Sequence, residues 1–376
     1  GNLMKVLQQV TDICKIVTEQ GHITYFSGFT TRNIILKIPS KIYYILTTAD
    51  LITLSQLFEH IDFPGKPDYN AELKLEDIII RFKIVNLSPQ KIDFSILRKE
   101  SLKELFTVDT LYYDPQREIF LDPLECYYDF RKKKLIPVPD FEDSYKNSPH
   151  KILHGFFLLA HINFTLPEEL AEKIEKIPFT IKDDYREELR QGLTEVLTSK
   201  NPFIALSYMD RFHIIEEIFS EPTPARSVPQ NKDFHPEGNV YEHTIECFKY
   251  IKKPPISLAL ALLLHDTGKP STATIKGKIL SFRGHSGVGV KIARKALRRL
   301  GYENKIIENV AFLIRYHLLT HEFRNLTEEE KLKFMQEPMF HNLLKLYKAD
   351  VLSCYGELSD YKKIISSYKK VVKHLE

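Results

Sequence analysis

The sequence has 376 residues but no Trp and only four Cys. The cysteines are Cys14, Cys126, Cys247 and Cys354, and no two of them form a C-x-x-C pair. This wide spacing argues against a disulfide framework and against a cysteine-based zinc site. It favours a protein of the reducing cytoplasm.

Long apolar segments and a strong net charge are also missing. The longest apolar run, Ile256–Leu264, has nine residues and includes one Ser, which is too short to cross a bilayer. The start carries no signal-peptide pattern. The formal net charge is only +3, so a nucleic-acid-binding face requires a local cluster of basic residues. We expect a cytoplasmic protein without a membrane partner, and the sequence leaves its oligomeric state open.

The composition that is present, 43% hydrophobic and 27% charged, is typical of a globular chain with two or three domains. The first third mixes an amphipathic helix with short β-branched or aromatic segments, whereas the chain from Lys151 onward has a helical pattern. The expected helix is Val6–Gln20, and the expected strands are Ile23–Phe26, Tyr43–Thr47, Asp77–Val85 and Ile92–Leu97. Two proline-rich stretches, 136–149 and 222–236, mark boundaries. We predict an α+β fold with a small mixed-sheet head (5–135), a helical neck (145–225) and an all-helical domain (235–376).

Histidine is concentrated in this third segment, which holds eight of the 14 histidines. The apolar run ends in His265-Asp266, and Gly268 and Pro270 follow it. This pattern predicts that the pair lies at the C-terminal end of a buried helix. Because a buried carboxylate must be paired or bound to a metal, the adjacent imidazole indicates a metal site. These ligand types suit Mn, Fe, Ni, Co or Zn, or Mg if oxygen ligands dominate.

Further candidate ligands, His243, His285, His317 and Asp350, lie 19 to 33 residues from one another or from the His-Asp pair. Such spacings predict that each ligand comes from a different helix and that they meet in the core of a bundle. We therefore expect a divalent metal centre with one or two ions. The remaining histidines are expected to be structural or on the surface: His235, His321, His341 and His374.

The ordered set His243, His265-Asp266 and Asp350 resembles the H…HD…D signature of HD-domain phosphohydrolases. Residues 235–244 are similar to the HD domain that is attached to bacterial tRNA CCA-adding enzymes and poly(A) polymerases. The resemblance implies that these four residues hold one ion and that Asp266 bridges to a second ion.

By the same resemblance, His285 and His317 complete the second site. Asp266 is then expected to position an activated water, and Lys269 to neutralise charge on a phosphoryl group. The alternative for Lys269 is an interaction with the nearby helix end.

A basic row follows His285 at helical spacing: Lys291, Arg294, Lys295 and Arg298. These four residues share one face of a helix. We interpret the row as a candidate binding surface for a nucleic-acid backbone, with a merely solvated helix face as the alternative.

The first segment resembles the nucleotidyltransferase head of the same family. Residues 26–36 and 39–49 are similar to its Gly-Gly/Arg-Asp stretch and to its D-x-D strand. The two carboxylate positions of that strand are Ile42 and Tyr44, and a third acid survives as Asp93. Nucleotidyl transfer needs metals held by clustered carboxylates, so these replacements predict an inactive head. The nucleotide-reading arginines of the resembled neck are replaced as well, by Lys151, His154 and Phe157.

The function predicted from the sequence is therefore metal-dependent phosphohydrolysis of nucleotides or RNA ends, with tRNA as one candidate substrate, by the HD domain beside an inactive nucleotidyltransferase-like head. Three alternatives remain open. The chain is a tRNA CCA-adding or poly(A) nucleotidyltransferase with relocated acids, a non-catalytic RNA-binding protein, or a cyclic dinucleotide phosphodiesterase.

Overall fold

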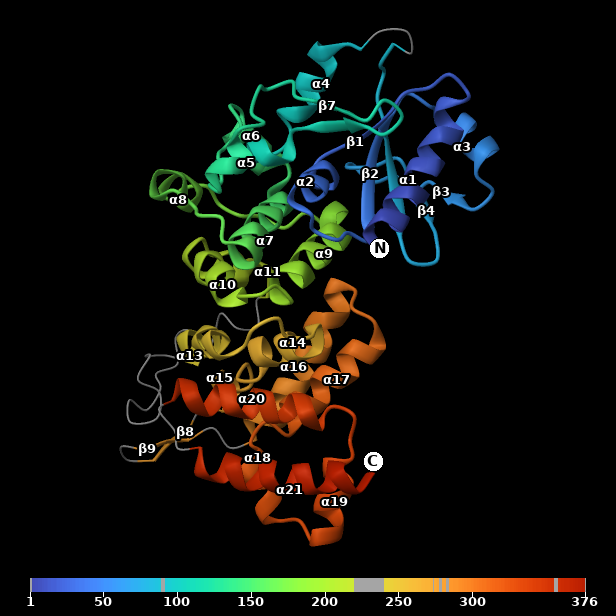
Figure 1. Cartoon of the computed structure of the whole chain (residues 1–376). Coiled ribbons are helices and arrows are strands. Elements are labelled where there is room, and N and C mark those ends of the chain that lie inside the picture. Colours follow the sequence, from blue (N-terminus) through green and yellow to red (C-terminus); the bar gives the residue numbers. More distant parts are fainter. Residues whose placement is uncertain are drawn as a thin grey trace. The chain divides into compact units, whose positions relative to one another are not determined.

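The computed structural model describes residues 2–88, 92–219, 240–272, 274–276, 279–281, 284–354 and 358–375. The chain divides into two compact units (Figure 1). The N-terminal unit comprises Gly1–Gly155, Phe164–Ile177 and Lys182–Tyr185, and the C-terminal unit comprises Phe156–Asn163, Pro178–Ile181 and Arg186–Glu376. The expected division into head, neck and third domain is finer than these two units and stays a prediction.

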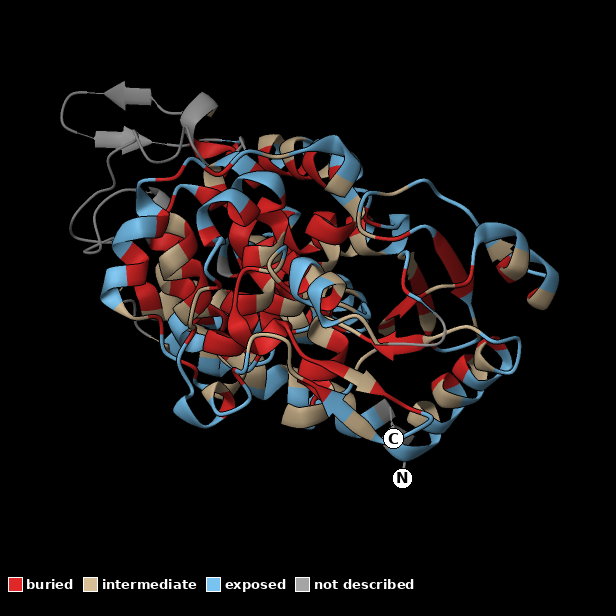
Figure 2. Ribbon diagram, turned by 90° about the horizontal axis from the view of Figure 1, so that it is seen from above, coloured by how far each residue is buried: buried red, intermediate tan, exposed pale blue. Residues whose placement is uncertain are grey.

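The N-terminal unit is built on one mixed sheet of seven strands. Its order is β3 (Ile61–Asp62), β4 (Ala71–Lys74), β5 (Ile79–Ile84), β2 (Ile42–Thr47), β1 (Thr24–Phe26), β6 (Tyr112–Asp114) and β7 (Ile119–Leu121). Strands β2 and β5 are parallel, and all other neighbours are antiparallel. The β-branched and aromatic residues of these strands pack into a buried core that Figure 2 shows in red. The predicted mixed-sheet head is confirmed.

The helices of this unit lie before, between and after the strands in the sequence. They are α1 (Asn2–Thr18), α2 (Phe29–Leu36), α3 (Leu51–Leu57), α4 (Phe94–Ser101), α5 (Asp129–Lys132), α6 (Phe141–Asn147) and α8 (Glu168–Glu175). Helix α1 confirms the amphipathic prediction, because Val10, Cys14 and Val17 pack on the sheet core. Helix α7 (Ile152–Ile162) passes from the N-terminal into the C-terminal unit.

The expected strand at Ile92–Leu97 is wrong, because this segment begins helix α4. The Asp93 carboxylate accepts a hydrogen bond from the backbone N–H of Ser95 at 3.0 Å and so caps the helix. Such a cap satisfies a helix-end N–H and outweighs the strand preference of the neighbouring Ile and Phe residues.

The C-terminal unit is mainly helical. Its helices are α9 (Arg186–Leu197), α10 (Pro202–Arg211), α11 (Ile214–Ile218), α13 (Val240–Glu246), α14 (Ile256–Leu264), α15 (Lys269–Thr272), α16 (His285–Leu300), α17 (Asn304–Arg315), α18 (Leu319–Arg324), α19 (Glu328–Met335), α20 (Phe340–Ser353) and α21 (Ser359–Leu375). The expectation of an all-helical domain is corrected by a hairpin of β8 (Thr274–Lys276) and β9 (Ile279–Ser281). Only two residues separate these β-branched segments, a spacing typical of hairpins.

Helix α14 lies at the centre of this unit and packs against α17 and α20. Every residue from Ser257 to Leu264 is buried, and the helix ends at His265. The prediction that His265 and Asp266 lie at the C-terminal end of a buried helix is thus confirmed. Among the helices that the structure describes, none combines the length and apolar character needed to span a bilayer.

Gly268 allows the turn after α14 to approach the start of α16. A Cβ atom at this position would lie 2.0 Å from the carbonyl oxygen of His285. Only glycine permits this close approach of two backbones. It brings His285, the first residue of α16, towards the end of α14.

Candidate metal centre

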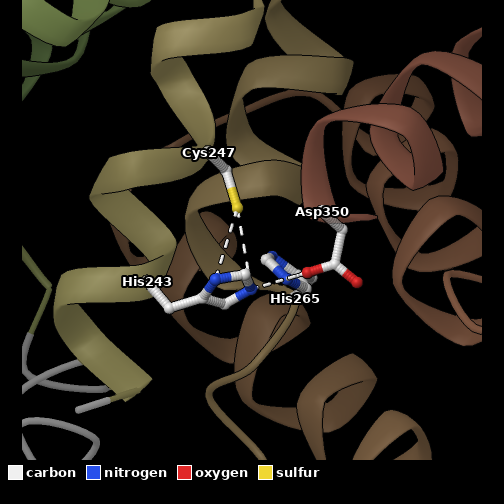
Figure 3. A group of neighbouring side chains, drawn as sticks. All are labelled: His243, Cys247, His265 and Asp350. Carbon is white, nitrogen blue, oxygen red and sulfur yellow. Dashed lines mark hydrogen bonds and ion pairs between the residues drawn. The ribbon is translucent and has the colours of Figure 1, made fainter. Parts of the chain in front are cut away.

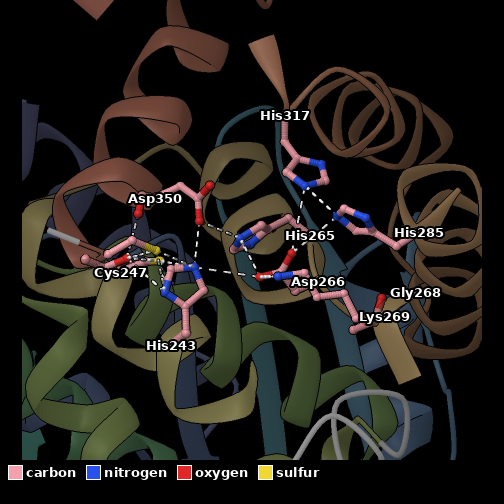
Figure 4. Close-up of polar contacts among 12 residues, drawn as sticks. His243, Cys247, His265, Asp266, Gly268, Lys269, His285, His317 and Asp350 are labelled. Carbon is pink, nitrogen blue, oxygen red and sulfur yellow. Dashed lines mark hydrogen bonds and ion pairs between the residues drawn. The ribbon is translucent and has the colours of Figure 1, made fainter. Parts of the chain in front are cut away.

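The C-terminal unit brings all six predicted metal ligands together (Figure 4). They come from separate elements, as their spacing in the sequence predicted. His243 lies on α13, His265 and Asp266 follow α14, His285 begins α16, His317 follows α17, and Asp350 lies on α20. Asp350 is half-buried and the other five are buried.

The first group gathers around one oxygen of Asp350 (Figure 3). His243 Nε2 lies 2.6 Å from Asp350 Oδ1, and His265 Nε2 lies 3.3 Å from the same oxygen. Cys247 completes the group, and the four ligand atoms all lie within 4.8 Å of one another.

The second group consists of Asp266, His285 and His317. Asp266 Oδ1 lies 3.6 Å from His285 Nε2 and 3.8 Å from His317 Nε2. The other oxygen, Oδ2, lies 3.2 Å from His265 Nε2 and 3.7 Å from His243 Nε2. The two oxygens of Asp266 therefore face the two groups, which is the geometry that a bridging carboxylate requires.

Hydrogen bonds to backbone carbonyls fix the orientation of two imidazole rings. His265 Nδ1 donates to the carbonyl of Leu262 and His317 Nδ1 donates to the carbonyl of Ile314, each at 2.6 Å. Because a carbonyl only accepts, the hydrogen sits on Nδ1 and Nε2 points towards the centre as a potential ligand atom. This is the outer hydrogen-bond pattern typical of metal-binding histidines.

The electrostatics of the centre also fit a divalent cation. Burial raises the pKa of Asp266, but the charges of His265 and Lys269 outweigh it and hold the pKa well below its ordinary value. Burial lowers the pKa of His317 to about 3, so this imidazole is neutral. Among the described residues, Asp266 Oδ2 accepts no hydrogen bond. A buried, ionised carboxylate beside a neutral imidazole suits a bound divalent ion.

Lys269 lies beside the predicted bridging acid. Its side chain is buried, and Nζ lies 3.3 Å from Asp266 Oδ2. The ammonium group thus compensates the carboxylate, and its role at a phosphoryl group stays a prediction. The histidines that were expected on the surface and that the structure describes are exposed: His321, His341 and His374. His235 lies outside the described residues.

Cys247 is a candidate ligand that sequence reasoning missed. It follows His243 by four residues, one helical turn, and its Sγ lies 3.7 Å from His243 Nε2. The missed signal is a His-x-x-x-Cys spacing, which places both side chains on the same helix face. The predicted absence of a cysteine-based zinc site rested only on the lack of C-x-x-C pairs, and a single cysteine one turn after a histidine is not such a pair.

The predicted basic row lies on helix α16. Lys291, Lys295 and Arg298 are exposed, whereas Arg294 donates to Glu308 at 2.9 Å. Three of the four cationic groups thus face solvent, and their binding role stays a prediction.

The N-terminal unit places Ile42 and Tyr44 on β2, as predicted. The Tyr44 hydroxyl accepts a hydrogen bond from Arg81 Nη1 at 2.9 Å, and Arg81 pairs with Glu72 at 2.9 Å. Asp93 is the cap of α4, where its carboxylate accepts from both the N–H and the hydroxyl of Ser95. Both groups of three or more potential metal ligands found among the described residues lie in the C-terminal unit.

Two other acids contact His150 and Lys151 directly before helix α7, the neck helix, and sequence reasoning did not identify them. His150 Nε2 lies 2.9 Å from Asp68 Oδ2, and the next residue, Lys151, donates from Nζ to Glu104 Oε1 at 3.3 Å. A Cβ atom at Gly28, which has a positive φ, would lie 3.8 Å from the same Glu104 oxygen. Glu104 therefore lies beside the turn that precedes α2, within the stretch that resembles the Gly-Gly motif.

The comparisons with known proteins agree with the predicted resemblance. Residues 239–354 match the HD domain family. The chain is 26% identical over 260 residues to a CC-adding tRNA nucleotidyltransferase of Thermus thermophilus, a match that covers 65% of this chain and 58% of that protein. It is 24% identical over 326 residues to a multifunctional CCA protein of Neisseria meningitidis, covering 84% of this chain and 77% of that protein.

Solved structures show the same fold. A Thermotoga maritima CCA-adding enzyme in complex with tRNA matches with a TM-score of 0.57 and 14% identity, covering 97% of this chain and 82% of that one. A tRNA nucleotidyltransferase in complex with a primer tRNA and an incoming ATP analogue matches with a TM-score of 0.55 and 16% identity, covering 96% of this chain and 98% of that one. The resemblance to CCA-adding enzymes, with a nucleotidyltransferase-type head and an HD domain, is confirmed.

These findings contradict the main function predicted from the sequence. The relatives and solved neighbours are CCA-adding tRNA nucleotidyltransferases, which favours the first alternative over an HD phosphohydrolase with an inactive head. The prediction of inactivity depended on the strand positions Ile42 and Tyr44, on Asp93 as the single remaining acid, and on the replaced arginines of the neck. It did not consider acids such as Asp68 and Glu104, which approach from other segments.

Proposed function

We propose that this protein transfers nucleotides to the 3′ end of an RNA, with tRNA as the substrate class. The similarity in sequence to tRNA nucleotidyltransferases, which reaches over 84% of the chain for the Neisseria protein, carries the proposal. The mixed-sheet head, whose fold matches nucleotidyltransferases seen with tRNA and with an ATP analogue, supports it.

We further propose that Asp68 and Glu104 supply the acids that β2 lacks. Burial raises the pKa of Glu104, and the negative charges of Asp109 and Asp68 act in the same direction, against the charge of Lys151. Carboxylates that repel one another in this way favour a bound cation, which relieves the repulsion. A divalent ion held there would supply charge stabilisation for phosphoryl oxygens.

Incorporation of labelled CTP or ATP into tRNA that lacks its 3′ end tests both proposals. We expect incorporation by the unaltered protein with Mg²⁺ or Mn²⁺, and its loss in Asp68→Asn and Glu104→Gln. Asp62→Asn, at an exposed acid on β3, is the matched control and should keep full activity. Absence of incorporation by the unaltered protein would overturn the proposed function. Unchanged incorporation in both acid variants would overturn only the assignment of the two acids.

In the C-terminal unit, we propose that His243, His265, Asp266 and Asp350 hold one divalent ion. His285 and His317, with the other oxygen of Asp266, would hold a second. Two ions bridged by a carboxylate bind phosphoryl oxygens and acidify a bound water. The support is the convergence of these side chains, with the Nε2 atoms of His265 and His317 directed inward. Metal content per protein chain, measured after dialysis, tests this proposal, and a chain that retains no ion would overturn it.

The exposed cations of α16, Lys291, Lys295 and Arg298, are proposed to bind the RNA backbone, with Arg294 as a weaker contributor because it is paired with Glu308. Each phosphate contact that is lost should reduce the salt dependence of RNA binding by about one unit of slope. Lys291→Ala and Lys295→Ala together should therefore flatten a plot of log affinity against log salt. An unchanged slope would show that this helix face is merely solvated.

A further inference from the structure

We propose that Cys247 is a direct ligand of the first ion, and that its thiolate makes this half of the centre select Zn²⁺ or Co²⁺ over Mg²⁺ and Mn²⁺. The inference rests on the metal centre proposed above and adds a soft ligand to it. Only the folded chain shows the thiol among the ligand atoms.

The position of Cys247 in the fold supports this role. Its side chain is fully buried at the start of the 3₁₀ turn that follows α13. The Sγ atom and the ligand atoms of His243, His265 and Asp350 lie mutually within 4.8 Å. Figure 3 shows the thiol pointing towards the His243 ring, on the side from which the four groups converge.

The distances suit a tetrahedral site. Metal–ligand bonds of about 2.0–2.3 Å place the ligand atoms of a tetrahedral ion roughly 3.3–3.8 Å apart. Cys247 Sγ lies 3.7 Å from His243 Nε2, and His265 Nε2 lies 3.3 Å from Asp350 Oδ1. The His243–Asp350 contact of 2.6 Å is shorter, and it would open by about 0.7 Å when an ion enters between the two groups.

The ring of His243 is held so that Nε2 faces this site. Ser353 Oγ donates to the carbonyl of Asp350 at 2.8 Å, and it lies 3.0 Å from His243 Nδ1. Since the hydroxyl hydrogen is used, Ser353 accepts from Nδ1–H, which leaves Nε2 as the ligand atom.

The distances to the two nitrogen atoms of the His243 ring distinguish Cys247 from the nearby Cys354. Cys354 Sγ lies nearer to His243 Nδ1, at 3.5 Å, than to Nε2, at 3.8 Å. Cys247 has the opposite preference, with 4.0 Å to Nδ1 and 3.7 Å to Nε2. Among the described residues, Cys354 is not part of the group whose ligand atoms lie mutually within 4.8 Å, and it provides a matched control of the same residue type.

A thiolate changes which ion the site prefers. Sulfur ligands favour Zn²⁺ and other softer ions, whereas Mg²⁺ and Mn²⁺ prefer oxygen. Binding forms a metal–sulfur bond and releases the thiol proton to the buffer. The second group offers only imidazole and carboxylate atoms, so the two halves of the centre would differ in preference.

Titration of the metal-free full-length protein with Co²⁺ is the direct test, because sulfur-bound cobalt has a charge-transfer absorption that nitrogen- or oxygen-bound cobalt lacks. We expect this absorption in the unaltered protein and in Cys354→Ser. In Cys247→Ser it should vanish while the visible absorption of bound cobalt persists. In competition between Zn²⁺ and Mn²⁺, Cys247→Ser should lower the preference for zinc by roughly 10- to 100-fold, the range produced by loss of even an outer-shell partner.

Cys247→Asp is the second variant, for the case that Cys247→Ser does not fold, and it keeps a ligand atom at this position. It should bind metal with its preference moved towards Mn²⁺. Bound cobalt without sulfur absorption in the unaltered protein would overturn the role of Cys247 and leave the metal centre standing. A failure to bind cobalt at all would overturn the metal centre itself, and the inference with it.

Discussion

The two units of this chain bury charged side chains in opposite ways. In the N-terminal unit, two buried arginines each pair with a buried carboxylate. Arg32 lies 3.2 Å from Asp109, and Arg81 lies 2.9 Å from Glu72, with both guanidinium groups fully buried. In the C-terminal unit, two carboxylates face several imidazoles at once, and Asp266 offers one oxygen to each of two groups.

The difference distinguishes buried charged groups that stabilise the fold from buried charged groups that can bind a metal ion. A paired charge has its partner within the protein, so its burial is compensated and the pair contributes to the stability of one conformation. Convergent carboxylates and imidazoles direct their ligand atoms at a common point, which an ion can occupy. Residues of the same chemical type thus have different roles in the two units.

The largest expected effect comes from breaking a pair in the N-terminal unit. Arg81→Met leaves Glu72 buried without its main partner and should lower the free energy of unfolding by about 3–5 kcal/mol. Lys74→Met is the matched control, because Lys74 contacts the same Glu72 but its side chain is 63% exposed. That change should cost less than about 1 kcal/mol. Denaturant unfolding measures both, and equal losses would show that burial does not distinguish the two pairs.

The next effect concerns the bridging carboxylate. Asp266→Asn removes the anionic charge that faces both groups and should weaken binding of both ions by more than about 100-fold. His317→Ala removes a ligand from one group only, so one ion should remain. Metal analysis after dialysis measures both, with His341→Ala at an exposed histidine as the control. Retention of two ions in Asp266→Asn would contradict the bridging role.

Removal of metal should destabilise the two units to different degrees. A ligand present at 100 times its Kd stabilises the folded state by about 2.7 kcal/mol. Chelation should therefore lower the melting temperature of the C-terminal unit, where two ions are proposed, by more than that of the N-terminal unit. Hydrogen exchange resolved by peptide assigns each transition, and a uniform shift in both units would contradict the comparison.

A smaller effect is the acid sensitivity of the N-terminal unit. Burial lowers the pKa of His150, and His150 and Lys151 outweigh burial to lower the pKa of Asp68. Both groups resist protonation when folded, so their contribution to stability is present near neutral pH and is lost as the pH falls. Below pH ~6.5, His150 should lower the free energy of unfolding by up to about 1.4 kcal/mol for each pH unit of acidification. Below pH ~4, Asp68 should contribute a similar slope.

Asp68→Asn should remove the lower of these two phases and leave the upper one. Chemical unfolding at a series of pH values, with and without the substitution, measures both. A stability curve that is flat between pH ~7 and pH ~4 would contradict the assignment of a neutral His150.

Several features could be predicted because they depend on local patterns. The apolar run before His265 determines a buried helix, and this helix ends at His265, where the predicted His-Asp pair begins. The segment 92–97 was assigned wrongly because the contact between Asp93 and Ser95 competes with the strand preference of its neighbours.

The set of six ligands, the mixed-sheet head and the resemblance to CCA-adding enzymes followed from the sequence alone, because each rests on residue types at recognisable spacings. Only the tertiary structure decided that the two oxygens of Asp266 face different groups, that Cys247 joins the first group, and that Asp68 and Glu104 lie beside one neck helix. The reason is physical: His243 and Asp350 are 107 residues apart in the chain yet 2.6 Å apart in space. Such contacts are set by how the helices pack, which no local pattern encodes.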